Sequence, residues 1–296
     1  MKKRPFLMAL LVLGAIFLFF LITVYFIAGF MGGSTSLALG EKVGVIEVEG
    51  VIVSSRKTID QLIRFKEDQS IKAIVIRVDS PGGGVGPSQE IFQEVSKTAG
   101  MKPVVVSMGS VAASGGYYIA APARRIFANP GTITGSIGVI MEFTNWQELL
   151  DKLGLQSQVV KSGRYKDIGS PVRPMSKEDR ELLQDLIDDV HSQFIAAVAL
   201  GRNIPEDKVR TLADGRIFTG RQALEAGLVD ELGNLQDAIA VAAQMGGIEE
   251  KPKVVYPPRE KGNLFDYLIE ETASSLRRGF QERTSSGLQY LWSGIE

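Results

Sequence analysis

Two apolar runs that end directly in glycine-rich turns constrain the fold of this 296-residue chain most strongly. The first, residues 71–78, leads into the turn 79–84 (Asp-Ser-Pro-Gly-Gly-Gly), and the second, residues 103–106, leads into 108–118 (Met-Gly-Ser-Val-Ala-Ala-Ser-Gly-Gly-Tyr-Tyr). Near-continuous apolar strands are typical of parallel sheets that are covered on both faces. Because helical patterns at 58–67 and 88–99 alternate with these strands, the sequence predicts an α/β fold with crossover helices.

Further elements follow from the same patterns. The sequence predicts additional strands at 43–48, 125–128 and 155–160, a short helix at 117–121 and a polar loop at 161–174. A long amphipathic helix should begin at Ser176, whose side chain can cap it. Its apolar stripe consists of Leu182, Leu183, Leu186, Ile187, Val190, Phe194 and Val198. One more helix is expected at 235–245.

The N-terminal segment predicts a membrane anchor. An apolar stretch at residues 6–31 follows Lys2, Lys3 and Arg4, and it is long enough for the roughly 20 residues that span a bilayer core. The basic residues place the N-terminus in the cytoplasm and the body on the extracytoplasmic side of a bacterial cell membrane. We therefore expect an anchor at 1–31, a tether at 32–42 and a body at 43–250. A proline-containing linker and an amphipathic tail should occupy 251–296, and the tail could dock on the body, a partner or lipid.

Composition limits the chemistry. A net charge of −1 gives no basic surface for nucleic acid, and the absence of cysteine excludes a disulfide framework, a thiol nucleophile and zinc sites built on cysteine. The single histidine, His191, lies on the predicted long helix and is best interpreted as structural, so an ordinary Ser–His–Asp triad is poorly supported.

Three glycine-rich turns, at 82–84, 115–116 and 135–138, lie near the ends of predicted strands, where parallel sheets form their site crevice. Ser114 lies at a strand-to-helix junction whose free N–H groups could stabilise an oxyanion. A neutral lysine can act as the base for such a serine. Lys161 and Lys166 both lie in the polar loop, and spacing alone does not choose between them.

The segments 79–84, 108–118, 134–139 and 161–167 together resemble signal peptide peptidase A, a bacterial family of membrane-anchored serine proteases. The resemblance extends from about residue 43 to 246 and implies a Clp-protease/crotonase-like fold of ββα repeats behind one transmembrane helix. No second copy of the motifs is found, so the chain resembles the short, single-domain form.

By motif, Ser114 resembles the nucleophile, Lys166 the general base and Ser136 the hydroxyl that orients the lysine. Gly83 and Gly115 resemble the oxyanion-hole donors, and Gly82 or Gly84 could replace Gly83. The resemblance implies peptide substrates (remnant signal peptides and other short or unfolded membrane-proximal peptides), no metal or other cofactor, and a ring-shaped homo-oligomer whose neighbours could share the site.

Three alternatives remain open. Crotonase-type acyl-CoA chemistry would leave Lys166 without a task and would put a CoA enzyme outside the membrane. A non-catalytic membrane scaffold would use the glycine turns only for packing. The same protease chemistry could also serve envelope quality control or bacteriocin resistance, and the sequence does not separate these roles.

Overall fold

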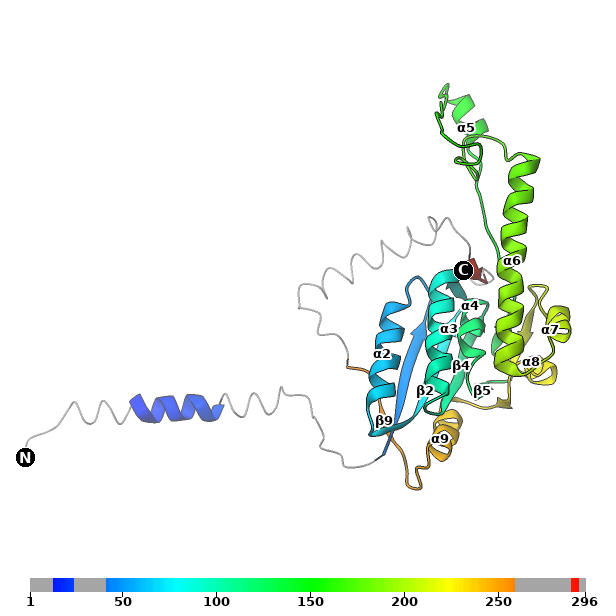
Figure 1. Cartoon of the computed structure of the whole chain (residues 1–296). Helices are drawn as coiled ribbons and strands as arrows, with labels where there is room; N and C mark the ends of the chain where they lie inside the picture. Colours follow the sequence, from blue (N-terminus) through cyan, green and yellow to red (C-terminus); the bar gives the residue numbers. More distant parts are fainter. Residues whose placement is uncertain (1–12, 24–40, 259–288, 293–296) are drawn as a thin grey trace, which may run out of the picture. The chain divides into compact units, whose positions relative to one another are not determined.

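The computed structural model describes residues 13–23, 41–258 and 289–292 (Figure 1). Residues 1–40 and 41–296 form two separate compact units. The described residues of the second unit form ten strands, namely β1 Lys42–Glu49, β2 Ile71–Ser80, β3 Gly82–Gly84, β4 Val104–Ala113, β5 Arg125–Ala128, β6 Ile133–Gly135, β7 Ile217–Thr219, β8 Glu231–Leu232, β9 Lys253–Val255 and β10 Gln289–Leu291. Its helices are α2 Arg56–Glu67, α3 Val85–Ala99, α4 Gly115–Ala120, α5 Gln147–Lys152, α6 Lys177–Arg202, α7 Glu206–Leu212, α8 Gly220–Ala226 and α9 Leu235–Met245.

An eight-stranded sheet forms the centre of this unit. Its order is β7-β6-β4-β2-β1-β9, and β5 pairs with β4 and β8. The pairs β1–β2, β2–β4 and β4–β6 are parallel, whereas β7 runs antiparallel to β6, so the sheet is mixed. The predicted α/β architecture is confirmed, including the strands expected at 43–48, 71–78, 103–106 and 125–128.

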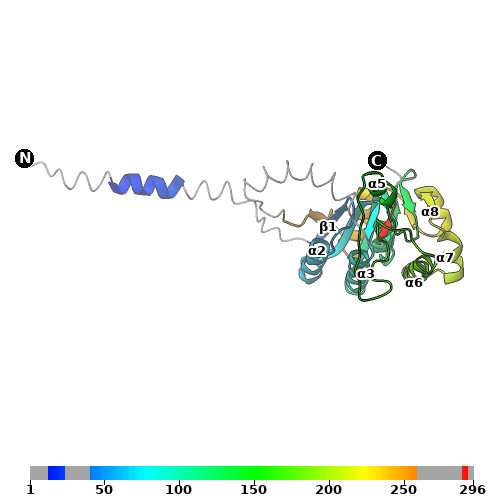
Figure 2. The same cartoon turned by 90° about the horizontal axis from the view of Figure 1, so that it is seen from above.

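The central strands are apolar on both faces because both faces are covered. In β2, Ile74 and Ile76 pack into a cluster with α2, α3, α4 and α6, while Ala73 and Val75 face α9. Figures 1 and 2 show α2, α3 and α6 along one face of the sheet. Each fully buried Val or Ile side chain contributes about 1.5–3 kcal/mol, so this double cover fixes the strand register.

Helix α6 begins with the predicted cap. The Ser176 hydroxyl accepts a bond from the Asp179 N–H (3.0 Å), and the Asp179 carboxylate accepts one from the Ser176 N–H (3.2 Å). Only the second half of the helix is packed, because Val190, Phe194 and Val198 are buried whereas Leu182 and Leu186 are 46% and 44% exposed. The first half extends beyond the sheet and leads back into α5 and its neighbouring loops (Figure 1). We call residues 140–175 the arm.

Two expectations need correction, and one element was not predicted. Residues 155–160 do not form a strand; they are irregular and exposed, with Val160 fully accessible. Part of the expected linker is β9, which pairs with β1 and extends the sheet beyond residue 250. At the end of the chain, β10 pairs with β3 in a second, two-stranded sheet that the sequence patterns did not predict. Residues 259–288 and 293–296 of the expected linker and tail lie outside the described residues.

The predicted transmembrane helix falls mostly outside the described residues. Residues 13–23 are helical and largely exposed, but residues 6–12 and 24–31 are not described, nor is the tether at 32–40. Across 13–23, 41–258 and 289–292, no helix has the length and apolar character needed to cross a bilayer.

Candidate active site

Ser114 occupies a strained turn between β4 and α4. Its backbone φ is +54° with ψ of −116°, outside the regions that L-residues normally adopt, and its surface is only 1% exposed. Its N–H donates to the Gly135 carbonyl and its own carbonyl accepts from the Tyr118 N–H, both at 2.8 Å. Strain of this kind persists only where the surrounding structure enforces it, and it is concentrated at functional sites. The turn therefore marks Ser114 as the leading candidate for a nucleophile.

The second glycine-rich turn lies directly beside the first. β6 runs parallel to β4 with Gly135 opposite Ala113, so the following residue, Ser136, lies next to Ser114. Ser136 also has a positive φ, of +50°, and is 7% exposed. Its N–H donates to the Arg216 carbonyl at 2.8 Å, which fixes this second strained turn.

The third turn brings backbone amides to the same place. The loop is held by Ile52, whose N–H donates to the Gly82 carbonyl (2.7 Å) and whose carbonyl accepts from the Gly84 N–H (2.9 Å). A Cβ on Gly115 would lie 3.1 Å from the Gly83 nitrogen, and one on Gly82 would lie 2.7 Å from the Gly115 nitrogen. Only residues without a Cβ allow the two loops to approach this closely. The nitrogens of Gly83 and Gly115 thus border one small space beside Gly82.

A carbonyl oxygen of the chain's own C-terminal segment occupies that space. A Cβ on Gly82 would overlap the Tyr290 carbonyl oxygen, and one on Gly115 would lie 3.1 Å from it. β10 runs antiparallel to β3 with Tyr290 opposite Gly83, and the Trp292 N–H donates to the Pro81 carbonyl at 2.8 Å. The segment lies as an extended peptide along the glycine edge, next to Ser114.

Lys166 is not part of this cluster. Ser114, Ser136, Gly83 and Gly115 lie close together, whereas Lys166 is exposed on the arm. Within the described part of the chain, no hydrogen bond or ion pair joins the Lys166 ammonium to another residue. The arm lies at the end of α6 that is remote from the sheet (Figure 1). Among the described residues, the cluster thus contains the two serines and the two glycines, but not Lys166.

Arg173 holds the lysine-bearing loop to the start of α6. Its guanidinium bonds Asp167 (Nε to Oδ2, 2.9 Å) and Asp179 (Nη1 to Oδ2, 2.6 Å), while the Lys161 ammonium pairs with Asp167. The hydrogen bond from Arg173, followed by that from Lys161, holds the pKa of Asp167 well below its usual range. Lys161 therefore has a structural partner, whereas the Lys166 side chain makes no contact with this network.

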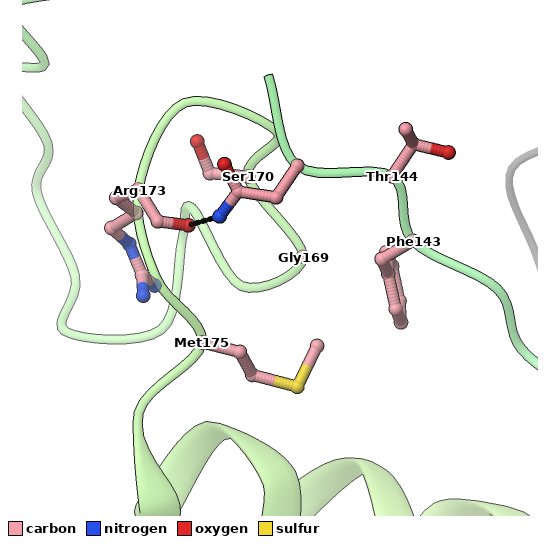
Figure 3. Close-up of a pocket in the computed structure, with 7 residues that line it drawn as sticks. Phe143, Thr144, Gly169, Ser170, Arg173 and Met175 are labelled. Atoms are coloured by element: carbon pink, nitrogen blue, oxygen red, sulfur yellow. Dashed lines mark hydrogen bonds between the residues drawn. The ribbon is translucent and has the colours of Figure 1, made fainter. Parts of the chain in front are cut away.

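A small pocket of about 60 Å³ lies within the arm, next to this network. Figure 3 shows Met175 and Phe143 on one side of it and Arg173 on the other, with a hydrogen bond from the Asn145 amide to the Arg173 carbonyl (3.0 Å). This volume holds little more than a water molecule or two, so the pocket is a packing gap of the arm and not a substrate site.

Other candidate groups do not join the site. His191 is half-buried on α6, as the structural interpretation expected. The described residues contain no cluster of three His, Asp or Glu side chains that could hold a metal ion. Sequence reasoning missed Tyr290 and the aromatic side chains around it, since a three-residue strand carries almost no periodic signal.

Comparison with known proteins places this geometry in context. A family model described as Peptidase family S49 matches residues 96–249, and one described as Clp protease matches residues 44–132, in agreement with the α/β fold. A protein of Synechocystis sp. whose name describes it as a protease is 48% identical over 71% of this chain and 76% of its own length. A protein of Enterococcus faecium named as a signal peptide peptidase is 38% identical, over 68% of this chain and 63% of its own. The chloroplastic serine protease SPPA of Arabidopsis thaliana is 36% identical over 75% of this chain and 32% of its own.

Proposed function

Because this chain is a serine protease that belongs to peptidase family S49, we propose that Ser114 is its nucleophile and Lys166 its general base. Ser136 orients the lysine, and the N–H groups of Gly83 and Gly115 form the oxyanion hole. The substrates are signal peptides left in the membrane and other short or unfolded peptides near it. The name of the Enterococcus faecium relative, signal peptide peptidase, supports the first of these substrate classes.

One observation carries this proposal: the Tyr290 peptide carbonyl lies beside Gly115, and Tyr290 pairs with Gly83, next to a strained and buried serine. This is the arrangement that acyl transfer requires, with donors preorganised where negative charge develops. Neutral Lys166 takes the Ser114 proton, the Ser114 oxygen bonds to the peptide carbon, and the C–N bond breaks as the amine leaves with a proton. Water then hydrolyses the ester and restores the serine.

Lys166 reaches Ser114 from a neighbouring copy of the chain in a ring-shaped homo-oligomer. Two observations support this part of the proposal. The arm that carries Lys166 lies away from α4, the helix that begins directly after Ser114 (Figure 1). Its surface also exposes large apolar side chains that a second copy would cover: Ile140, Phe143, Trp146, Leu149, Leu153, Leu155, Val159 and Val160. Exposed apolar surface on this scale is typical of interfaces.

We further propose that residues 6–31 anchor the chain in a bacterial cell membrane with its body outside the cytoplasm. Only about ten residues separate this apolar stretch from the first charged position, Glu41. Fully extended, they reach about 35 Å, so the body acts close to the bilayer.

Mixing two inactive variants tests the shared site. Ser114→Ala and Lys166→Ala should each fail to cleave an apolar signal-like peptide while still assembling. A one-to-one mixture that is allowed to reassemble should regain about a quarter of wild-type activity, because a serine-bearing subunit meets a lysine-bearing neighbour at that frequency. No recovery in mixed rings would place both groups in one chain, and cleavage by both single variants would refute the dyad.

A further inference from the structure

Strand β4 carries a bulge shortly before Ser114. Val78 of β2 pairs with Met108 of β4. Two residues further along β2, Ser80 pairs with Ala112. A step of two residues in β2 thus matches a step of four in β4, which leaves two extra residues in β4. A bulge of this kind bends its strand and re-aims the side chains that follow, and bulges are common next to active sites.

The bulge determines which residue of β4 reaches the glycine-rich turn that follows β2. Continuing the observed register by two residues puts Ser114 level with Gly82, whereas an unbroken register would put Ala112 there. The contacts agree, because a Cβ on Gly82 would lie 2.7 Å from the nitrogen of Gly115, the residue after Ser114. The bulge also separates the part of β4 that pairs with β5 from the part that pairs with β6. Without the two extra residues, an alanine would occupy the place of the proposed nucleophile.

The side chain of Asp79 lies against this bulge. Asp79 is the β2 residue at which the register shifts, and its Oδ1 accepts a hydrogen bond from the Val111 N–H at 3.1 Å. A Cβ on Gly109 would lie 2.5 Å from Asp79 Oδ2 and 2.6 Å from its Cγ, so the carboxylate packs directly on the Gly109 backbone. The Asp79 carbonyl is held separately, because it accepts from the Gly50 N–H at 2.9 Å. One side chain therefore contacts both ends of the bulge.

The outer side of the bulge is open. Ser110 is exposed, and the bulge borders a hollow of about 410 Å³ that is also lined by Gly131. A second hydrogen bond runs from the Thr132 hydroxyl to the Gly109 carbonyl at 2.7 Å. Because the hollow provides little packing from this side, the hydrogen bonds to Asp79 and Thr132 set the path of the backbone.

We infer that Asp79 is a positioning residue: by bonding the Val111 N–H it holds the bulge that brings Ser114 to the oxyanion-hole glycines. This inference rests on the proposed function, since it takes Ser114 as the nucleophile. The role requires an oxygen acceptor of the right shape and not a negative charge, so asparagine should replace Asp79 whereas alanine should not. Misplacing reacting groups by about 1 Å costs about 100-fold in rate, so the loss should appear in kcat.

Steady-state kinetics of three variants test the inference. Full-length wild type, Asp79→Asn, Asp79→Ala and the control Asp68→Ala would be assayed in detergent micelles with one signal-like peptide. The kcat would be expressed per serine titrated by a fluorophosphonate, so that misfolded enzyme does not count. We expect Asp79→Asn to stay close to wild type and Asp79→Ala to lose about 10- to 100-fold in kcat with little change in KM.

The control removes the same kind of bond elsewhere. Asp68 Oδ1 also accepts from a backbone N–H, that of Ser70 at 2.8 Å, just before the start of β2. Asp68→Ala should therefore keep the wild-type kcat. A wild-type kcat in Asp79→Ala, or equal losses in Asp79→Asn and Asp79→Ala, would overturn the inference.

A pair of glycine variants tests the same contact if Asp79→Ala does not fold. Gly109→Ala keeps Asp79 but places a methyl group against its carboxylate, and should lower kcat. Gly131→Ala, in the lining of the same hollow, adds a methyl group that meets no atom within 4 Å and should leave kcat unchanged. Neither glycine has a positive φ, so the backbone accepts alanine at both positions. Equal kcat values for the two variants would also overturn the inference.

Hydrogen exchange distinguishes failure of this inference from failure of the proposed function. Followed by mass spectrometry on peptides that cover residues 108–114, exchange should be faster in Asp79→Ala than in wild type or Asp79→Asn. Faster exchange in Asp79→Ala, together with cleavage that survives Ser114→Ala, would retain the contact with the bulge and refute the proposed nucleophile. Cleavage that requires Ser114 but has the same kcat in every Asp79 variant would retain the nucleophile and refute the role of Asp79.

Discussion

Replacing Gly115 with alanine tests the proposed oxyanion hole directly. Its φ is not in the positive region, so the backbone accepts an L-residue there. The added methyl group would lie 2.7 Å from the Ser88 hydroxyl oxygen and 3.1 Å from both the Gly83 nitrogen and the Tyr290 carbonyl oxygen. The Ser88 side chain can rotate away. The Gly83 nitrogen is backbone, however, and the carbonyl stands where a substrate's carbonyl would bind.

The size of the expected loss in kcat depends on how far the Tyr290 carbonyl oxygen must move. Contacts of 3.1 Å oblige the Tyr290 carbonyl oxygen and the Gly83 nitrogen to shift by a few tenths of an ångström, which disturbs the proposed donor–acceptor geometry. Losing one oxyanion donor entirely costs about 10²- to 10³-fold in kcat. Because Gly115→Ala weakens two donors and removes neither, we expect kcat to fall about 10- to 100-fold with a smaller change in KM.

The assay compares steady-state cleavage of one peptide by wild type, Gly115→Ala and the control Gly86→Ala. A Cβ on Gly86, at the start of α3, meets no atom within 4 Å, so this variant should keep wild-type activity. Adding Ser88→Ala to Gly115→Ala should not restore kcat, because the crowding at Gly83 remains. Wild-type kcat in a folded Gly115→Ala enzyme would refute the role of these two amides.

Three further outcomes are expected. Lys166→Arg should abolish turnover because arginine stays protonated. The control Lys161→Arg can still pair with Asp167 and should keep most of the wild-type kcat. Equal kcat values for the two variants would refute Lys166 as the base. Hydrogen bonds from Arg173 lower the pKa of Asp167 and Asp179. These contacts therefore stabilise the arm at any pH above the ordinary carboxylate pKa range, and this stabilisation is lost as the pH falls through the lowered pKa values. Trp146 fluorescence in a Trp292→Phe chain should thus be constant from about pH 8 to 5 and change below about pH 4, and an onset near pH 6 would contradict this. Ending the chain after Leu288 removes β10, which we expect to compete with substrate. The KM for peptides should therefore be lower than that of the full chain. An unchanged KM would mean that β10 does not compete with substrate.

The sequence predicted best the elements whose side chains are buried by other parts of the same chain. Residues 71–78 are apolar on both faces because helices cover both faces, and the Ser114 turn combines a small residue and two glycines where the backbone must reverse. The apolar residues at 155–160 follow a strand-like pattern too, but they lie exposed on the arm, where Leu155 and Val159 are 55% and 53% accessible. The apolar pattern of a segment does not by itself reveal whether its side chains are buried within the same chain or exposed on its surface.

The site was predictable as a set of turns but not as a completed arrangement. Glycine spacing identifies the loops at Gly83 and Gly115, and the register of β4 and β6 then brings Ser136 beside Ser114. The position of Lys166 depends on how the arm leaves α6, for which no local pattern exists. β10 pairs with β3, which lies about two hundred residues earlier in the sequence. The three residues of β10 alone therefore predict neither this partner strand nor the burial of Tyr290.

The separation between the sheet and the arm has a consequence for when proteolysis can begin. Helix α6 has 26 residues, equivalent to about 39 Å of helix, and only its second half packs on the body. Under the proposed arrangement, a newly made chain is inactive until it assembles with other copies. Low concentration therefore prevents premature proteolysis, as a removable propeptide does in other proteases. Activity per chain should then rise with the surface density of the enzyme in the membrane.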